Sequence, residues 1–138
     1  MTESSVSINA ISPSLEDYLE HIYMEQKSAG NVRVKDLSRT MNVRMPSVNN
    51  AIRLLKQRGL VKQEPYGNIE MTESGIQLAM HIFERHETLT SFFIKLGISE
   101  KIAEQDACSI EHTISEETFS KLADYYKNFM NGEQTSEK

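Results

Sequence analysis

Three residues near the carboxyl end of the chain, Cys108, Glu111 and His112, have side chains that can hold a metal ion. Their spacing of i, i+3 and i+4 places them on one face of any helix that contains them. A thiolate, a carboxylate and an imidazole form a mixed ligand set that suits a first-row transition metal. The sequence therefore predicts that this segment contributes to a metal site.

Three residues elsewhere in the chain can add to this site. Asp17 and Glu20 repeat the i, i+3 spacing near the amino end, and His86 lies between the two clusters. Gathering carboxylates, imidazoles and a thiolate in one place is costly unless a cation offsets their charge. Each residue alone also has an ordinary interpretation, since a lone cysteine is often a small buried hydrophobe. The residues by themselves therefore leave metal binding open.

The charge of the chain is divided along its length. The 138 residues carry a formal net charge of −5, yet residues 31–63 hold eight lysine and arginine residues against one aspartate, a local charge of +7. Solvated protein surfaces usually mix the two signs, so an excess of this size indicates a surface that faces phosphate groups.

The pattern of apolar residues predicts the elements that position these side chains. Helical spacing indicates helices over residues 13–29, 34–41 and 46–58, with a tight turn at 42–44 between the last two. Two helices joined by so short a turn are typical of a helix-turn-helix. Two alternating runs, 60–64 and 69–71, surround the turn residues 65–68 and predict a β-hairpin in the position of a wing.

Three more helices are predicted after the hairpin. The first begins at Thr72 and ends near Leu96, the second begins at Ser99 and carries the Cys108 cluster, and the third begins at Ser115. Ile76 is one of the apolar positions of the first helix, and Phe129 on the third is expected to face inward. The polar tail from residue 131 is expected to fray.

The exposed positions of the helix-turn-helix divide into two groups of expected DNA contacts. Residues at the amino end of the second helix would enter the major groove and meet base edges. Basic residues outside that end would contact phosphates and position the protein. The base-contacting candidates are Arg44, Pro46, Ser47, Asn49, Asn50 and Arg53, and the phosphate-contacting candidates are Arg33, Lys35, Arg39 and Lys62.

The remaining composition narrows the class of protein. One cysteine excludes an internal disulfide framework and is typical of a reducing compartment. No apolar run approaches the length of a membrane span, and the first ten residues do not read as a signal peptide. We therefore expect a soluble cytoplasmic protein that does not act at a membrane.

Three segments resemble a known family. The segment 12–23, SPSLEDYLEHIY, is similar to the opening helix of the diphtheria toxin repressor and manganese transport regulator family. Arg85-His86-Glu87 resembles the ligand motif on the family's long helix, and the segment 106–112, DACSIEH, resembles its second ligand segment. With the winged helix between them, the resemblance covers about residues 12–126.

The resemblance implies a mainly α fold and a function. Residues 1–72 would form a winged helix-turn-helix DNA-binding domain with a small β-hairpin wing, and residues 73–138 a helical dimerisation and metal-binding domain. Members of the family are homodimeric repressors of metal-uptake genes that bind a palindromic operator when Fe²⁺ or Mn²⁺ activates them. The implied ligands, for one or two ions per subunit, are Asp17, Glu20, His86, Cys108, Glu111 and His112.

The ligand set implied by the resemblance is a hybrid of two branches. Asp17 and Glu20 match ligands of the manganese-type members, whereas Cys108 matches the cysteine of the iron-type members. Thr90 and Glu104 replace residues that iron-type members use at an ancillary site, so that site does not carry over. The chain also lacks the SH3-like third domain of the longer members, as compact manganese-type members do.

Two other functions are consistent with parts of the sequence. A winged-helix regulator could respond to an organic ligand or to oxidation at Cys108, but this leaves Asp17, Glu20 and His86 unexplained. A carboxylate-bridged metalloenzyme would need a repeated Glu-x-x-His motif. Glu111 and His112 are adjacent instead, and no second copy exists, so we expect neither an enzyme nor an organic substrate.

Overall fold

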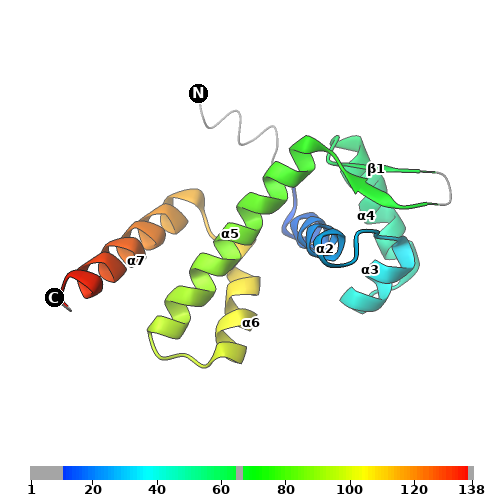
Figure 1. Cartoon of the computed structure of the whole chain (residues 1–138). Coiled ribbons are helices and arrows are strands. Elements are labelled where there is room, and N and C mark those ends of the chain that lie inside the picture. The colour runs from blue at the N-terminus through cyan, green and yellow to red at the C-terminus, as the bar shows by residue number, and fades with distance from the viewer. Residues whose placement is uncertain (1–10, 65–66, 137–138) are drawn as a thin grey trace. The chain divides into compact units, whose positions relative to one another are not determined.

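The computed structural model describes residues 11–64 and 67–136 of the chain (Figure 1). These residues form two compact units, the first ending at Ile82 and the second beginning at Phe83. The first unit contains three helices, a two-stranded sheet and the start of a fourth helix. These elements are α2 (Pro13–Ala29), α3 (Val34–Met41), α4 (Met45–Gln57), β1 (Val61–Gln63), β2 (Ile69–Met71) and the first part of α5 (Glu73–Lys95).

Helix α2 has the ends that its sequence predicts. The hydroxyl of Ser12 accepts a hydrogen bond from the backbone N–H of Leu15 at 3.2 Å, and Pro13 occupies the first helical position. Gly30 ends the helix with φ at +85°, a conformation that favours glycine. The helix buries Leu19 and Ile22 completely in the core of the first unit, which fixes the face on which its polar residues stand.

The helix-turn-helix consists of α3 and α4. Asn42 has the left-handed conformation, φ 57° and ψ 48°, and its N–H donates to the carbonyl of Arg39, so that the chain reverses within three residues. Helix α3 buries Leu37, and α4 buries Val48, Ala51, Ile52 and Leu55. With one face of each helix buried in a shared core, the opposite face of α4 is left for contacts outside the molecule.

The predicted wing is present as an antiparallel pair, β1 and β2. Val61 stands opposite Met71 and Lys62 opposite Glu70, with the first pair buried and the second exposed. The N–H of Ile69 donates at 2.7 Å to the carbonyl of Val32, in the segment between α2 and α3, which attaches the wing to the helix-turn-helix. The predicted turn residues Pro65 and Tyr66 lie outside the described residues.

Thr72 joins the wing to α5, as the sequence predicts. Its hydroxyl accepts from the N–H of Gly75 at 3.0 Å and donates to the carbonyl of Gly59 at 2.7 Å. Its own N–H donates to the carbonyl of Leu60 at 3.1 Å. A Cβ at position 75 would lie 2.0 Å from that same Leu60 oxygen, so only glycine allows this close approach.

The second unit consists of the rest of α5 with α6 (Glu100–Glu111) and α7 (Glu116–Ser136). Its buried core is small, with Leu89, Ala107 and Phe119 at the centre. None of the helices in the part of the chain that the structure describes is long and apolar enough to cross a membrane.

Two details of the predicted helices are wrong. Helix α7 continues to Ser136, five residues beyond the start of the tail that was expected to fray. Phe129, expected to face inward, is 45% exposed, and Ile76, an apolar position of α5, is 36% exposed. Helical spacing identifies the apolar face of a helix, but the elements that pack against that face decide which of its residues are buried.

Candidate functional site

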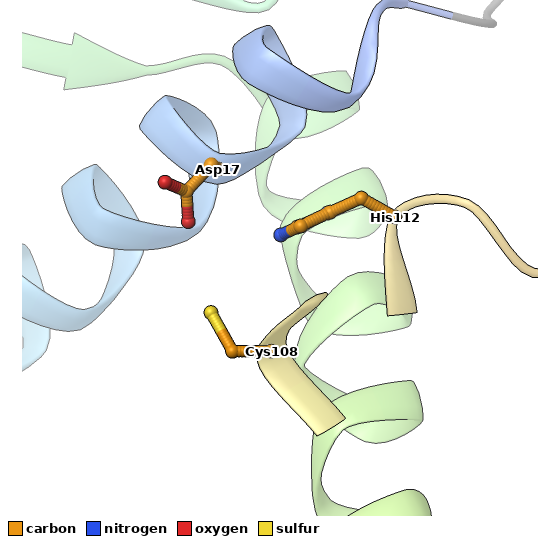
Figure 2. Close-up of side chains that lie close together, drawn as sticks. All are labelled: Asp17, Cys108 and His112. Carbon is orange, nitrogen blue, oxygen red and sulfur yellow. The ribbon is translucent and has the colours of Figure 1, made fainter. Parts of the chain in front are cut away.

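The end of α6 carries three of the predicted metal ligands. Ser99 caps the helix in an extended conformation, φ −60° and ψ 150°, and one helical face then brings Cys108, Glu111 and His112 together. Figure 2 shows the side chains of Cys108 and His112 on the same side of α6. Cys108 is half-buried and is the single cysteine of the sequence, so it forms no disulfide within the chain.

Glu111 is the centre of this cluster. Its side chain is completely buried, and each of its two carboxylate oxygens faces an imidazole. Oε2 lies 2.9 Å from Nδ1 of His86, which comes from α5, and Oε1 lies 3.2 Å from Nε2 of His112. The second unit therefore brings three predicted ligands, from two helices, into direct contact.

The chemistry of this cluster is consistent with a bound cation. Although His112 is near, Oε1 of Glu111 accepts no hydrogen bond from any described residue, because that contact lacks hydrogen-bond geometry. A buried carboxylate oxygen without a donor is costly to desolvate. Carboxylate oxygen, imidazole nitrogen and thiolate sulfur together form a donor set for a divalent transition metal. The residues present therefore fit the metal that the sequence predicts.

The other two predicted ligands, Asp17 and Glu20, lie on α2 in the first unit (Asp17 is drawn in Figure 2). Glu20 is only 4% exposed although it is acidic, and Asp17 is half-buried. Acidic side chains are rarely buried this strongly unless they are paired or bind a metal.

His21 is a residue near this site that the sequence analysis missed. Its Nδ1 lies 2.9 Å from the backbone carbonyl of Asp17 and 3.5 Å from the Asp17 carboxylate. The side-chain hydrogen bond to Asp17 raises the pKa of His21, while burial acts in the opposite direction. The i, i+4 spacing from Asp17 was the available signal.

The ten predicted DNA contacts all lie on the first unit, and every one of them is exposed: Arg33, Lys35, Arg39, Arg44, Pro46, Ser47, Asn49, Asn50, Arg53 and Lys62. The Arg53 guanidinium donates to the side-chain oxygen of Asn50 at 2.6 Å, so two of the base-contacting candidates are hydrogen-bonded to each other. Arg39 is paired with Asp36 at 3.3 Å. The arrangement leaves one face of the helix-turn-helix and its wing open to a ligand.

A shallow hollow of about 580 Å³ lies on the same unit. It is lined by the phosphate candidates Arg33 and Lys35 and by Gln63 of the wing. Lys56 of α4 also lines it, a residue that the sequence analysis counted in the basic segment but did not select as a contact. The three basic side chains outnumber the single carboxylate in the lining, Glu64, so the depression is positive overall.

Comparison with known families assigns both parts of the chain. Residues 10–69 match the family described as "Iron dependent repressor, N-terminal DNA binding domain". Residues 72–136 match "Iron dependent repressor, metal binding and dimerisation domain".

Individual relatives agree with this assignment. An uncharacterised helix-turn-helix transcriptional regulator of Methanocaldococcus jannaschii is 36% identical over 86% of this chain and 97% of that protein. The transcriptional regulator MntR of Lysinibacillus sphaericus is 31% identical over 81% of each. Among solved structures, a manganese-dependent transcriptional repressor in complex with manganese is 27% identical, with a TM-score of 0.73.

The match to that structure covers 80% of this chain and 51% of the other, so the chain spans about half of that repressor's length. The family resemblance, the winged-helix fold class and the divalent metal cofactor predicted from the sequence are confirmed. A regulator of organic ligands or oxidants is not favoured. The chain belongs to the iron-dependent repressor family of metal-dependent transcriptional repressors.

Proposed function

We propose that this repressor binds a palindromic operator as a homodimer when Fe²⁺ or Mn²⁺ occupies its metal centre, and so controls genes for metal uptake. The observation that carries the proposal is the buried carboxylate of Glu111 between two imidazoles, His86 and His112. A buried carboxylate is costly to desolvate, and a divalent cation would offset its charge and use all three side chains.

We assign one or two ions per subunit to the six proposed ligands. Asp17 and Glu20 of the first unit supply two carboxylates. The second unit supplies the carboxylate of Glu111, the thiolate of Cys108 and the imidazoles of His86 and His112. A bound divalent ion supplies the positive charge that lets these groups approach one another.

The proposed ligands on α2 explain how metal would control DNA binding. Helix α2 shares its buried core with α4, through residues such as Leu19 and Ile52. A tie from Asp17 and Glu20 to ligands of the second unit would therefore restrain α4 as well. In a dimer that restraint would fix the spacing of the two α4 helices, which a palindromic site requires. The restraint would favour the DNA-binding population.

The type of metal follows from the hardness of the ligands. The thiolate of Cys108 favours Fe²⁺, Co²⁺ or Zn²⁺, while the carboxylates of Asp17, Glu20 and Glu111 suit Mn²⁺ and Fe²⁺. Fe²⁺ satisfies both preferences, and Mn²⁺ is the second candidate because of the two carboxylates on α2.

We assign DNA binding to residues 1–72 and dimerisation with metal binding to residues 73–138, a division by role that remains a prediction. The second unit has exposed apolar side chains that a partner subunit could cover: Ile94, Leu96, Ile102, Tyr125 and Phe129. We propose no catalytic role, and we place the protein in the cytoplasm, where its DNA would be.

An anaerobic binding titration tests this function. A DNA fragment is first selected from a random pool by the metal-loaded protein, and its affinity is then measured with Mn²⁺, Fe²⁺, Co²⁺ and Zn²⁺ in turn and with chelator. We expect Fe²⁺ or Mn²⁺ to tighten binding at least about tenfold, a coupling within the usual 1–3 kcal/mol for two linked sites. Equal, weak activation by all four metals would contradict a dedicated sensor.

A further inference from the structure

Arg85, which precedes His86 on α5, is buried among groups from α6 and α7. Its side chain is 11% exposed, and its guanidinium carbon lies 5.1 Å from the centre of the Phe119 ring. Nη1 donates to the backbone carbonyl of Glu111 at 2.8 Å, and Nη2 donates to Oε1 of Glu116 at 3.1 Å. The second unit thus holds an arginine whose side chain is largely buried.

Both acceptors of Arg85 are oxygens at helix ends, one of a backbone carbonyl and one of a carboxylate. The carbonyl of Glu111 belongs to the last turn of α6, where carbonyls lack a partner within the helix, and Glu116 is the first residue of α7. A cation at the carboxyl end of a helix is favoured by the helix dipole. The planar guanidinium reaches both acceptors at once, which a lysine ammonium does less well. Arg85 therefore fixes where α6 ends and α7 begins relative to α5.

Two consecutive residues of α5 contact the same residue of α6. Arg85 holds the backbone of Glu111, and His86 holds its carboxylate through Nδ1 and Oε2 at 2.9 Å. With its backbone and one carboxylate oxygen restrained, Glu111 has little freedom left. Its second oxygen is directed at Nε2 of His112, 3.2 Å away.

We propose that Arg85 is a positioning residue of the metal centre, which orders Glu111 and His112 before a metal ion binds. The inference rests on the proposed function and deepens it, because Arg85 itself contributes no ligand atom. Ordering the ligands in advance lowers the cost of assembling them on binding. Groups that orient metal ligands typically change metal affinity by about 10–100-fold when they are removed.

The test uses Co²⁺ alone, under anaerobic conditions, with the full chain. Arg85→Ala removes the hydrogen bonds to both Glu111 and Glu116. Arg85→Lys keeps the positive charge and can keep one of these two hydrogen bonds. Lys101→Ala removes an exposed charge from α6 and is the control. We measure Co²⁺ affinity, the visible d–d absorption of the Co²⁺ protein and thermal unfolding of the metal-free protein.

Arg85→Ala should weaken Co²⁺ binding about tenfold and alter the d–d band. Arg85→Lys should fall between it and the wild type, and Lys101→Ala should match the wild type.

Glu116→Gln separates the two contacts of Arg85. Because Glu116 is 59% exposed, its ion pair with Arg85 contributes little, and this variant should weaken Co²⁺ binding less than Arg85→Ala does. An effect as large as that of Arg85→Ala would overturn the role of the Glu111 carbonyl.

Two further results would overturn the inference altogether. One is an Arg85→Ala protein with the affinity and spectrum of the wild type. The other is unfolding of both Arg85 variants without metal, which would make Arg85 a folding residue. A wild-type chain that binds no Co²⁺ would instead refute the proposed function, and the inference with it.

Discussion

At the scale of single residues, we expect the buried carboxylate of Glu111 to lower the stability of the metal-free protein. A completely buried carboxylate is costly to desolvate, and one of its oxygens receives no hydrogen bond within the described structure. We predict that Glu111→Gln, which keeps the shape and removes the charge, weakens Co²⁺ binding by more than about tenfold, since it removes a ligand charge rather than an orienting group. The unfolding temperature of the metal-free protein should stay equal or rise.

Calorimetry of the metal-free protein and a Co²⁺ titration check this prediction. Glu104→Gln is the matched control, because Glu104 is an exposed glutamate on the same helix. If calorimetry finds the metal-free Glu111→Gln protein less stable than the metal-free wild type, the carboxylate stabilises the fold and is not a preformed metal ligand.

We predict that Cys108 sets the metal preference of the proposed site. Cys108→Glu replaces a soft ligand with a hard carboxylate, so activation should move towards Mn²⁺ and away from Co²⁺ and Zn²⁺. The near-ultraviolet absorption of a Co²⁺–thiolate bond should disappear. Cys108→Ser should also remove that absorption but should not gain the preference for Mn²⁺. A wild-type Co²⁺ protein without the absorption would exclude Cys108 as a thiolate ligand.

The candidate ligands could be predicted from the sequence because most of them recur at helical spacings and because the segments that carry them resemble those of a known family. His21 and Arg85 were not selected, although both lie beside a proposed ligand. The i, i+4 spacing of His21 from Asp17 would have been enough to predict their contact. Arg85 could not be found, because its acceptors lie 26 and 31 positions away in the chain and one of them is a backbone carbonyl.

At the scale of elements, the joint between the wing and α5 depends on Gly75. A methyl group there would meet the Leu60 carbonyl oxygen, which also accepts from Thr72. We predict that Gly75→Ala lowers the free energy of unfolding by about 1–3 kcal/mol, the usual cost of overpacking a backbone contact. Urea denaturation measures the change.

Gly132→Ala is the control for this substitution. Gly132 lies in α7 with open space around its Cα, and alanine there should be neutral or should stabilise by up to about 1 kcal/mol. Equal stability of the Gly75→Ala and wild-type proteins would show that the joint shifts without cost and does not hold the wing.

Within the described residues, the sequence predicted the order and type of the helices and of the hairpin, because caps such as Ser12 and Thr72 act locally. The prediction was wrong where burial depends on which element packs against a residue. Phe129, expected to face inward, is exposed, and Lys95 lies over its ring at 5.9 Å. The division of roles near residue 72 stays a prediction.

At the scale of the whole molecule, the charge pattern separates two kinds of DNA contact. We predict that Lys62→Ala or Arg39→Ala weakens binding to the selected site and to random DNA alike, and reduces the slope of log affinity against log salt by about 0.9 per lost phosphate contact. Asn50→Ala or Arg53→Ala should instead lower the ratio of specific to random binding, by about 1–3 kcal/mol.

The hydrogen bond between Arg53 and Asn50 sharpens this prediction. Because each side chain orients the other, the two substitutions should not be additive when combined. Binding isotherms at several salt concentrations, on both kinds of DNA, distinguish the classes. Four substitutions with the same salt slope and the same specificity ratio would refute the division into phosphate and base contacts.

The hydrogen bond from Ile69 to Val32 has a consequence for how copies of the chain meet. A two-stranded sheet leaves an edge on each side, and an open edge invites pairing with a strand of another molecule. The Val32 carbonyl occupies one position on the outer edge of β2, and β1 pairs with its inner edge. A foreign strand would have to displace this bond before it could add to the hairpin. The outer edge of β2 is thereby partly closed to pairing with a strand of another molecule.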